Sequence, residues 1–164
     1  MEELEKSSGF PSRKRVLEGP VAVIECVQEI PCDVCGSACP YGAIEVAHIR
    51  GLPKLMGEKC KGCGLCLPSC PGLAIFLVDY NFSKDEALIS FPYEFLPTPK
   101  VGEEVHATDR LGHAVTMGRV VKIMEKGDFA GTGVVSIAVP KEWVRQVRGI
   151  KLARGEGQAW GIER

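Results

Sequence analysis

The stretch Cys60-Lys-Gly-Cys63-Gly-Leu-Cys66-Leu-Pro-Ser-Cys70-Pro71 carries four cysteines with the spacing C-x2-C-x2-C-x3-C-P. A second run, Cys26-x5-Cys32-x2-Cys35-x3-Cys39-Pro40, lies upstream and keeps this spacing except at its first cysteine. The two runs contain all 8 cysteines of the chain. Any chemistry that depends on thiols is therefore confined to residues 26–70.

An internal repeat relates the two runs. A shift of 31 residues places Cys32, Cys35, Cys39, Pro40, Ala43 and Ile44 onto Cys63, Cys66, Cys70, Pro71, Ala74 and Ile75. The shift brings Glu29 onto Cys60, so Cys26, which lies shortly before Glu29, is the natural substitute. We expect each half to run from a ligand loop through a short helix before the Cys-Pro step into a strand, over Ala43–His48 and Ala74–Tyr80.

Eight thiolates in two sets are the ligand count of two [4Fe–4S] clusters. Gly62 and Gly64 would let backbone N–H groups approach the sulfur atoms, where hydrogen bonds tune the reduction potential. A four-cysteine zinc site is the alternative, because Cys32-x2-Cys35 and Cys60-x2-Cys63 suffice for one. The zinc site leaves four cysteines and both Cys-Pro steps unexplained, so the sequence favours iron–sulfur clusters. The long gap after Cys26 leaves open a three-iron first cluster or a labile fourth ligand.

The composition is that of an ordinary globular protein, with 164 residues, 45% hydrophobic content and a net charge of −1. This charge argues against nucleic-acid binding driven by bulk electrostatics. The N-terminal residues MEELEKSSGF show no secretory signal, and no apolar run approaches the roughly 18 residues that span a bilayer. We therefore expect the cysteines to be metal ligands in a reducing cytoplasm rather than disulfides.

Nothing in the sequence predicts a catalytic site. His48, His106 and His113 are scattered, with no carboxylate or serine at the spacing of a triad. Neither GxGxxG nor GxxxxGK[ST] occurs, so we expect the chain to bind no flavin or nucleotide by itself.

Residues 21–80 resemble the two-[4Fe–4S] bacterial ferredoxins, on the strength of both Cys-Pro runs. In that family the fourth cysteine of each run ligates the other cluster. The resemblance implies that cluster I is held by Cys26, Cys32, Cys35 and Cys70, and cluster II by Cys60, Cys63, Cys66 and Cys39. This exchange would crosslink the two halves through metal and bring the clusters close enough to exchange electrons.

The fold class that we expect is α+β: a ferredoxin-like two-cluster domain followed by a small antiparallel β-barrel or sheet with a short C-terminal helix. We place an N-terminal arm without a core of its own at 1–19, the ferredoxin domain at 20–82, a β-rich docking domain at 83–154 and a tail at 155–164. The first strand is expected at Val21–Val27. Four more follow the polar segment Asn81–Glu86, at Ala87–Phe95, Glu103–Thr108, His113–Ile123 and Gly133–Val139, with a turn at Asp109–Gly112. The helix would begin at Pro140 and place Lys141, Arg145, Arg148, Lys151 and Arg154 on a positive face.

A second resemblance covers nearly the whole chain. It rests on GPVAVIECVQEIPC (Gly19–Cys32) and on a β-rich tail with VPKEWVRQVRGI (139–150). The chain is similar to the small ferredoxin-like subunits of multi-subunit FAD-dependent amino-acid or amine dehydrogenases, of the dye-linked proline or hydroxyproline type. In such complexes a flavoprotein subunit oxidises a C–N bond. The resemblance implies a non-catalytic subunit of a hetero-oligomer, which relays single electrons from that FAD to a second flavin (FAD or FMN) or an external acceptor.

Two other functions stay open. A free-standing soluble ferredoxin would shuttle among several enzymes, although it has no need of the second half of this chain. A redox-sensing binding module would use its β half to contact protein or nucleic acid. Near-neutral charge and the lack of a helix-turn-helix pattern weigh against that module.

Overall fold

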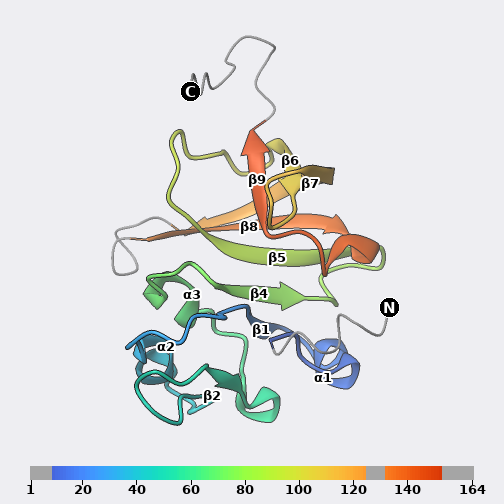
Figure 1. Ribbon diagram of the computed structural model, residues 1–164. Helices are drawn as coiled ribbons and strands as arrows, with labels where there is room; N and C mark the ends of the chain where they lie inside the picture. The colour runs from blue at the N-terminus through green and yellow to red at the C-terminus, as the bar shows by residue number, and fades with distance from the viewer. Residues whose placement is uncertain (1–8, 125–131, 153–164) are drawn as a thin grey trace.

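One antiparallel sheet of seven strands organises the part of the chain that the structure describes. The structure is a computed structural model, and it describes residues 9–124 and 132–152 (Figure 1). The strand order in the sheet is β1-β4-β5-β8-β7-β6-β9. The strands are β1 (Val21–Ile24), β4 (Ile75–Asp79), β5 (Glu86–Tyr93), β6 (Glu104–Thr108), β7 (Ala114–Met124), β8 (Gly133–Pro140) and β9 (Gly149–Leu152). A separate pair is formed by β2 (Ile44–Glu45) and β3 (Lys54–Leu55).

The helices are short. They are α1 (Arg13–Leu17), α2 (Val34–Ala38) and α3 (Cys66–Ser69), with 3-10 turns at η1 (Gly57–Lys59) and η2 (Lys141–Trp143). The cysteine spacing leaves room for about one helical turn before each Cys-Pro step, which is why α2 and α3 end so soon. The fold is therefore mostly β, and the α+β prediction is corrected on this point. Within the described residues no helix has the length and apolar character needed to cross a bilayer.

The strands predicted in the second half of the sequence are confirmed as β5, β6, β7 and β8. The turn predicted at Asp109–Gly112 is also confirmed, because the Gly112 N–H donates to the Asp109 carbonyl at 3.1 Å. Gly112 has a φ of 82°, which favours glycine. Nearer the cysteines the predicted strands were too long: β1 ends at Ile24, and β2 keeps only Ile44–Glu45. The chain there turns away to place the cysteines.

The prediction of a helix beginning at Pro140 is wrong. Only the turn η2 forms, and the chain then enters β9, which pairs with β6. Arg148 is buried and ion-paired, and Lys151 lies on β9, so the basic residues share no helical face. Arg154 lies outside the described residues. Burial of Arg148 overrides the helical spacing, because a buried charge requires a partner.

The sheet is open, and β7 bends it. β7 pairs with β6 along its first half and with β8 along its second, from Arg119 to Met124. A register shift between Val120 and Lys122 interrupts the second ladder. Such irregularities increase the local twist of a strand. In Figure 1, β9 crosses in front of β8. Of the two forms expected, barrel or sheet, the structure has the sheet.

The two sides of β1 face different surroundings. Val23 packs into the main hydrophobic core together with Ile89, Phe91 and other residues of the sheet. Ala22 and Ile24 pack on the opposite side, in a cluster with the cysteines. All residues of β1 are buried. The sheet also continues past the predicted domain boundary, because β4 pairs directly with β5. The cysteine loops and the sheet therefore share β1 and β4.

A core substitution tests this arrangement. Phe91→Ala is expected to lower the free energy of unfolding by about 3–5 kcal/mol, because Phe91 is only 2% exposed and its removal leaves a cavity. The matched control is Phe95→Ala, at a ring that is 73% exposed, with an expected loss under about 1 kcal/mol. Urea unfolding under anaerobic, reducing conditions measures both. Equal losses for the two variants would contradict the core described above.

Candidate metal centre

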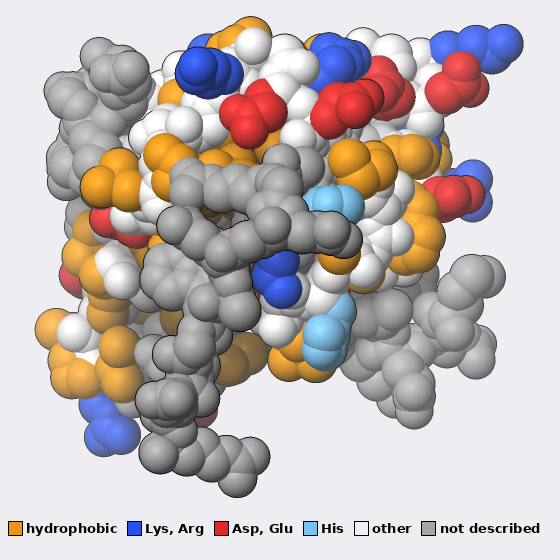
Figure 2. Space-filling view, turned by 90° about the horizontal axis from the view of Figure 1, so that it is seen from above, with side chains coloured by type: hydrophobic (Ala, Val, Ile, Leu, Met, Phe, Trp, Pro, Cys, Tyr) orange, Lys and Arg blue, Asp and Glu red, His pale blue; other side chains and the backbone are white. Residues whose placement is uncertain are grey.

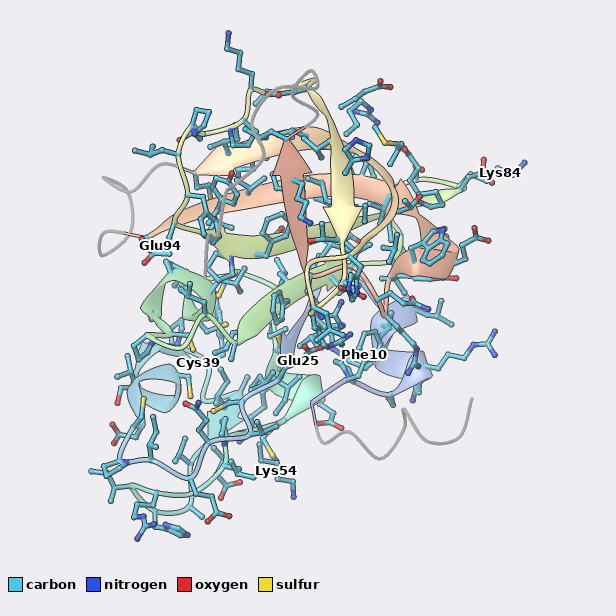
Figure 3. All side chains as sticks on the ribbon, turned by 45° about the horizontal axis from the view of Figure 1, so that its top comes forward. Phe10, Glu25, Cys39, Lys54, Lys84 and Glu94 are labelled. Carbon is cyan, nitrogen blue, oxygen red and sulfur yellow. The ribbon has the colours of Figure 1, made fainter. Side chains whose placement is uncertain are left out.

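The eight cysteines line two separate cavities, and all are free thiols. Cavity I is lined by Cys26, Cys32, Cys35 and Cys70. Cavity II is lined by Cys39, Cys60, Cys63 and Cys66. Each cavity takes three cysteines from one run and the last cysteine of the other run. The structure thus brings together the same two sets that the resemblance implied, while ligation of clusters by them stays a prediction. The sulfur atoms lie around α2 and α3, near the labelled Cys39 in Figure 3.

The two Cys-Pro steps have the same backbone geometry. The Ala43 N–H donates to Cys39 Sγ at 3.3 Å, and the Ala74 N–H donates to Cys70 Sγ at 3.5 Å. The residue before each alanine has a positive φ, 60° at Gly42 and 51° at Leu73. A leucine in this conformation is strained by roughly 1–2 kcal/mol, and surrounding structure must hold it there. Each step therefore presents a cysteine sulfur with an N–H donor already in place.

The strands repeat as well. Ile24 pairs with Ile75 between β1 and β4, and Leu55 pairs with Ile44 between β3 and β2. The next residue along also matches, because the Glu25 N–H donates to the Ala74 carbonyl at 2.8 Å. The Met56 N–H likewise donates to the Ala43 carbonyl at 2.7 Å. The repeat of 31 residues read from the sequence is thus confirmed as a structural repeat.

The halves differ at their first cysteine. Cys60 follows the turn η1, and its N–H donates to the Gly57 carbonyl at 3.2 Å. Cys26 follows Glu25 directly after the end of β1. The long gap before Cys32 is therefore the loop that leaves β1, and Cys26 precedes that loop. Cys26 is thus preceded along the chain by Glu25 and, before it, by the paired strand β1.

Arg15 on α1 contacts the candidate site, which sequence reasoning missed. Its guanidinium donates to the carbonyls of Gly57 and Cys60 at 2.7 Å each. It also donates to the carbonyls of Gly19 at 3.1 Å and Pro20 at 2.9 Å. Only the basic character of residues 13–15 pointed to this region in the sequence.

These contacts tie α1 to cavity II. Val16 on α1 is buried, so α1 packs against the rest of the chain. Residues 1–8 lie outside the described range. The adjacent strand β1 also reaches cavity II, because the Ala22 N–H donates to Cys60 Sγ at 3.5 Å. Gly62 lies so close to Pro20 that a Cβ there would approach the Pro20 Cβ to 2.5 Å.

Burial changes the acidity of the thiols. Burial, and then the charges of Cys60 and Cys63, raise the pKa of the Cys66 thiol to about 12. Burial likewise raises the pKa of Cys35. Positive charge favours the thiolate form of buried thiols such as Cys35 and Cys66, and coordinated iron supplies such charge. The donor set therefore suits a cluster whose metal ions bind the sulfurs.

Apolar residues lie beside the thiols of both cavities. Ile44 lines cavity II and Ile75 lines cavity I. Eight thiols around two cavities, with apolar residues beside them, fit two iron–sulfur clusters.

Both cavities have exposed apolar residues at their rims. Val27 and Ile30 line cavity I and are 79% and 50% exposed. Tyr41 and Leu65 line cavity II and are also exposed. Both cavities are therefore lined in part by residues that solvent reaches.

Arg15 offers a test of how the site is held. Arg15→Gln is expected to lower the free energy of unfolding by about 2–4 kcal/mol, because several charge-assisted hydrogen bonds to carbonyls are lost. Arg13→Gln removes the same charge from the same helix at an exposed position, and its expected effect is within about 0.5 kcal/mol. Denaturant unfolding of both variants provides the measurement. A loss in Arg13→Gln as large as that in Arg15→Gln would mean that net charge, rather than the four contacts, matters.

Comparison with known proteins agrees with this geometry. Residues 53–76 match the family model of the 4Fe-4S binding domain. A stretch of 44 residues is 43% identical to a subunit of the Na(+)-translocating ferredoxin:NAD(+) oxidoreductase complex of Acetobacterium woodii, and covers 27% of this chain and 13% of that protein. A stretch of 46 residues is 41% identical to the pyruvate synthase subunit PorD of Methanothermobacter marburgensis, and covers 28% of this chain and 51% of that protein. No solved structure matches the chain.

Each of these matches covers under a third of the chain, and the family model matches within the cysteine-rich part. The chain spans about half the length of one of these relatives and about an eighth of the other. Over the matched stretch it is distantly related to subunits of larger enzymes, and it contains a ferredoxin-type 4Fe-4S binding domain.

Proposed function

We propose that this chain is an electron-transfer subunit that holds two [4Fe–4S] clusters. Cluster I would occupy cavity I, and cluster II would occupy cavity II. The observation that carries the proposal is the crossed lining of the two cavities, each with three cysteines of one run and the last cysteine of the other. When bound, each cluster accepts and releases one electron at a time.

The protein's part in this function is to hold and tune the clusters. The N–H groups of Ala43, Ala74 and Ala22 point at cysteine sulfurs, and such hydrogen bonds stabilise the extra negative charge of a reduced cluster. Ile24, Ile44 and Ile75 limit the access of water from the side of the sheet. Helix α2 ends at Cys39 and helix α3 ends at Cys70, and each of these cysteines lines the cavity of the other run. Contacts between α2 and α3 keep the two cavities adjacent.

Two exposed rims suit a relay, with one partner at each cavity. A flavin releases two electrons as a pair, and two one-electron clusters let them leave in sequence. We propose that the donor is a FAD-containing dehydrogenase subunit that oxidises an amino acid or amine such as proline, and that the acceptor is a second flavin or an external carrier. The resemblance over the whole chain is the ground for this pairing, while the naming of both relatives as subunits supports only a place in a multi-subunit complex. The chain itself would be non-catalytic and cytoplasmic.

The charge distribution favours protein partners over nucleic acid. Figure 2 shows the side of the molecule opposite the cysteine loops. Among the described residues there, acidic and basic side chains lie next to each other along one border, together with histidine and apolar side chains. A nucleic-acid surface would concentrate basic residues instead.

The first experiment is metal analysis of the anaerobically purified chain. About eight iron and eight sulfide per chain are expected, together with a spin-coupled EPR spectrum after dithionite reduction. Zinc in place of iron would overturn the proposal.

Co-expression with candidate flavoprotein subunits then tests the partner. A chain that stays monomeric and reduces several unrelated acceptors equally well would be a free-standing ferredoxin instead.

Double variants test which cysteines share a cluster. Cys39→Ala/Cys63→Ala removes two ligands of cluster II, so about four iron per chain should remain. Cys39→Ala/Cys35→Ala removes one ligand from each cluster, so both clusters should be lost or made labile. Iron and sulfide content with EPR measures the outcome, and the wild-type chain purified in parallel is the control. The reverse pattern would show that the fourth cysteine serves its own run.

A further inference from the structure

The Glu25 carboxylate binds two arginines from the second half of the chain, Arg110 and Arg148. Its Oε1 accepts a hydrogen bond from Arg148 Nε at 2.7 Å, and its Oε2 accepts one from Arg110 Nε at 2.7 Å. Arg110 Nη2 donates to the same carboxylate, so Arg110 binds it in a bidentate fashion. Glu25 lies directly before Cys26 and itself lines cavity I. Its position beneath the sheet is labelled in Figure 3.

Arg148 is held rigidly and away from water. Its side chain is only 3% exposed, whereas that of Arg110 is 44% exposed. Its Nη1 donates to the carbonyls of Val144 and Val147, and its guanidinium lies 5.2 Å from the ring centroid of Phe76. The Arg148 backbone N–H donates to the Thr108 carbonyl at 2.8 Å. Arg148 is therefore a fixed anchor, and Glu25 is the group that it anchors.

The two arginines come from the edge of the sheet that β6 and β9 form. Arg110 is in the turn between β6 and β7, and its Nη1 donates to the Arg145 carbonyl at 3.1 Å. Arg148 directly precedes β9, the last strand of the sheet. Glu25 follows β1, the first strand. The carboxylate thus joins the two edges of the curled sheet at the point where the chain enters cavity I.

The first cysteine of each run has its own anchor. Cys60 has the turn η1 and the Arg15 guanidinium on its carbonyl. Cys26 has no comparable turn before it, because it follows β1 within two residues. The ion-paired side chain of its neighbour Glu25 takes that place. Cys26, which lies at a different spacing from Cys60, is therefore held by the Glu25 ion pairs instead of a turn.

We propose that the Glu25–Arg148 pair, assisted by Arg110, is a positioning device that holds Cys26 at cluster I. The strands beyond residue 83 would then be part of the cluster I site, in addition to any role in docking. The inference rests on the proposed two-cluster function. Loosening the pair should free Cys26 while Cys32, Cys35 and Cys70 remain in place. Cluster I would then lose the iron that Cys26 holds.

The decisive variant is Glu25→Gln/Arg148→Met. Removing both charges together leaves no unpaired buried charge, and such replacements are often neutral for stability. The chain should fold, but cluster I should lose about one iron per chain as Fe2+, and a one-electron oxidant such as ferricyanide, added in parallel to the wild-type chain, should then give the EPR signal of an oxidised three-iron cluster in the variant. Cluster II should keep its reduced signal. Arg148→Lys, which keeps a charge near Glu25, should retain more of the four-iron cluster than Arg148→Met.

The matched control is Glu86→Gln/Arg119→Met, which removes an ion pair of 3.4 Å between β5 and β7. It should leave both clusters intact. Full four-iron occupancy of cluster I in the Glu25→Gln/Arg148→Met chain would overturn the inference. So would equal loss of both clusters, because that pattern is general destabilisation. A wild-type chain without iron would instead overturn the proposed function, so the two failures are distinguishable.

Discussion

The pairing of β1 with β4 is the constraint on which the other features depend. Its register places Ile24 opposite Ile75, and therefore brings the start of the first cysteine run beside the end of the second. Cys26 and Cys70 can line one cavity because of that register. The same two strands form one end of the seven-stranded sheet. A slip of one residue would turn Ala22 and Ile24 toward the main core and remove the wall behind the cysteines.

Two arginines make contacts close to the first cysteine of each run. Arg15 contacts the backbone of the Cys60 loop, and Arg148 contacts the side chain that precedes Cys26. The pKa of Glu25 is lowered although burial by itself raises it, because Arg110 and Arg148 outweigh that effect. Burial lowers the pKa of Arg148. Each arginine therefore fixes a short stretch of chain whose conformation sequence spacing alone does not determine.

The site could be anticipated from the sequence further than the fold could. The cysteine spacing marked all eight thiols as candidate ligands, because ligand distances are local and their pattern is strict. The division of the thiols between the two cavities was implied by the resemblance to two-cluster ferredoxins. The strands β5 to β8 followed from runs of β-branched residues between turns. The contacts of Arg15, Arg110 and Arg148 could not be derived, because they join residues far apart in sequence. The helix expected after Pro140 does not form, for the same reason. The residues have helical spacing, but Arg148 pairs with Glu25, far away in sequence.

The two anchors differ in how much of the chain they join. The contact of Arg15 with Cys60 joins residues 45 apart in sequence. The contact of Arg148 with Glu25 joins residues 123 apart, so it depends on a much longer stretch of chain. A chain cut before Arg148 would keep the Arg15 contact at cavity II but would lose the anchor beside cavity I.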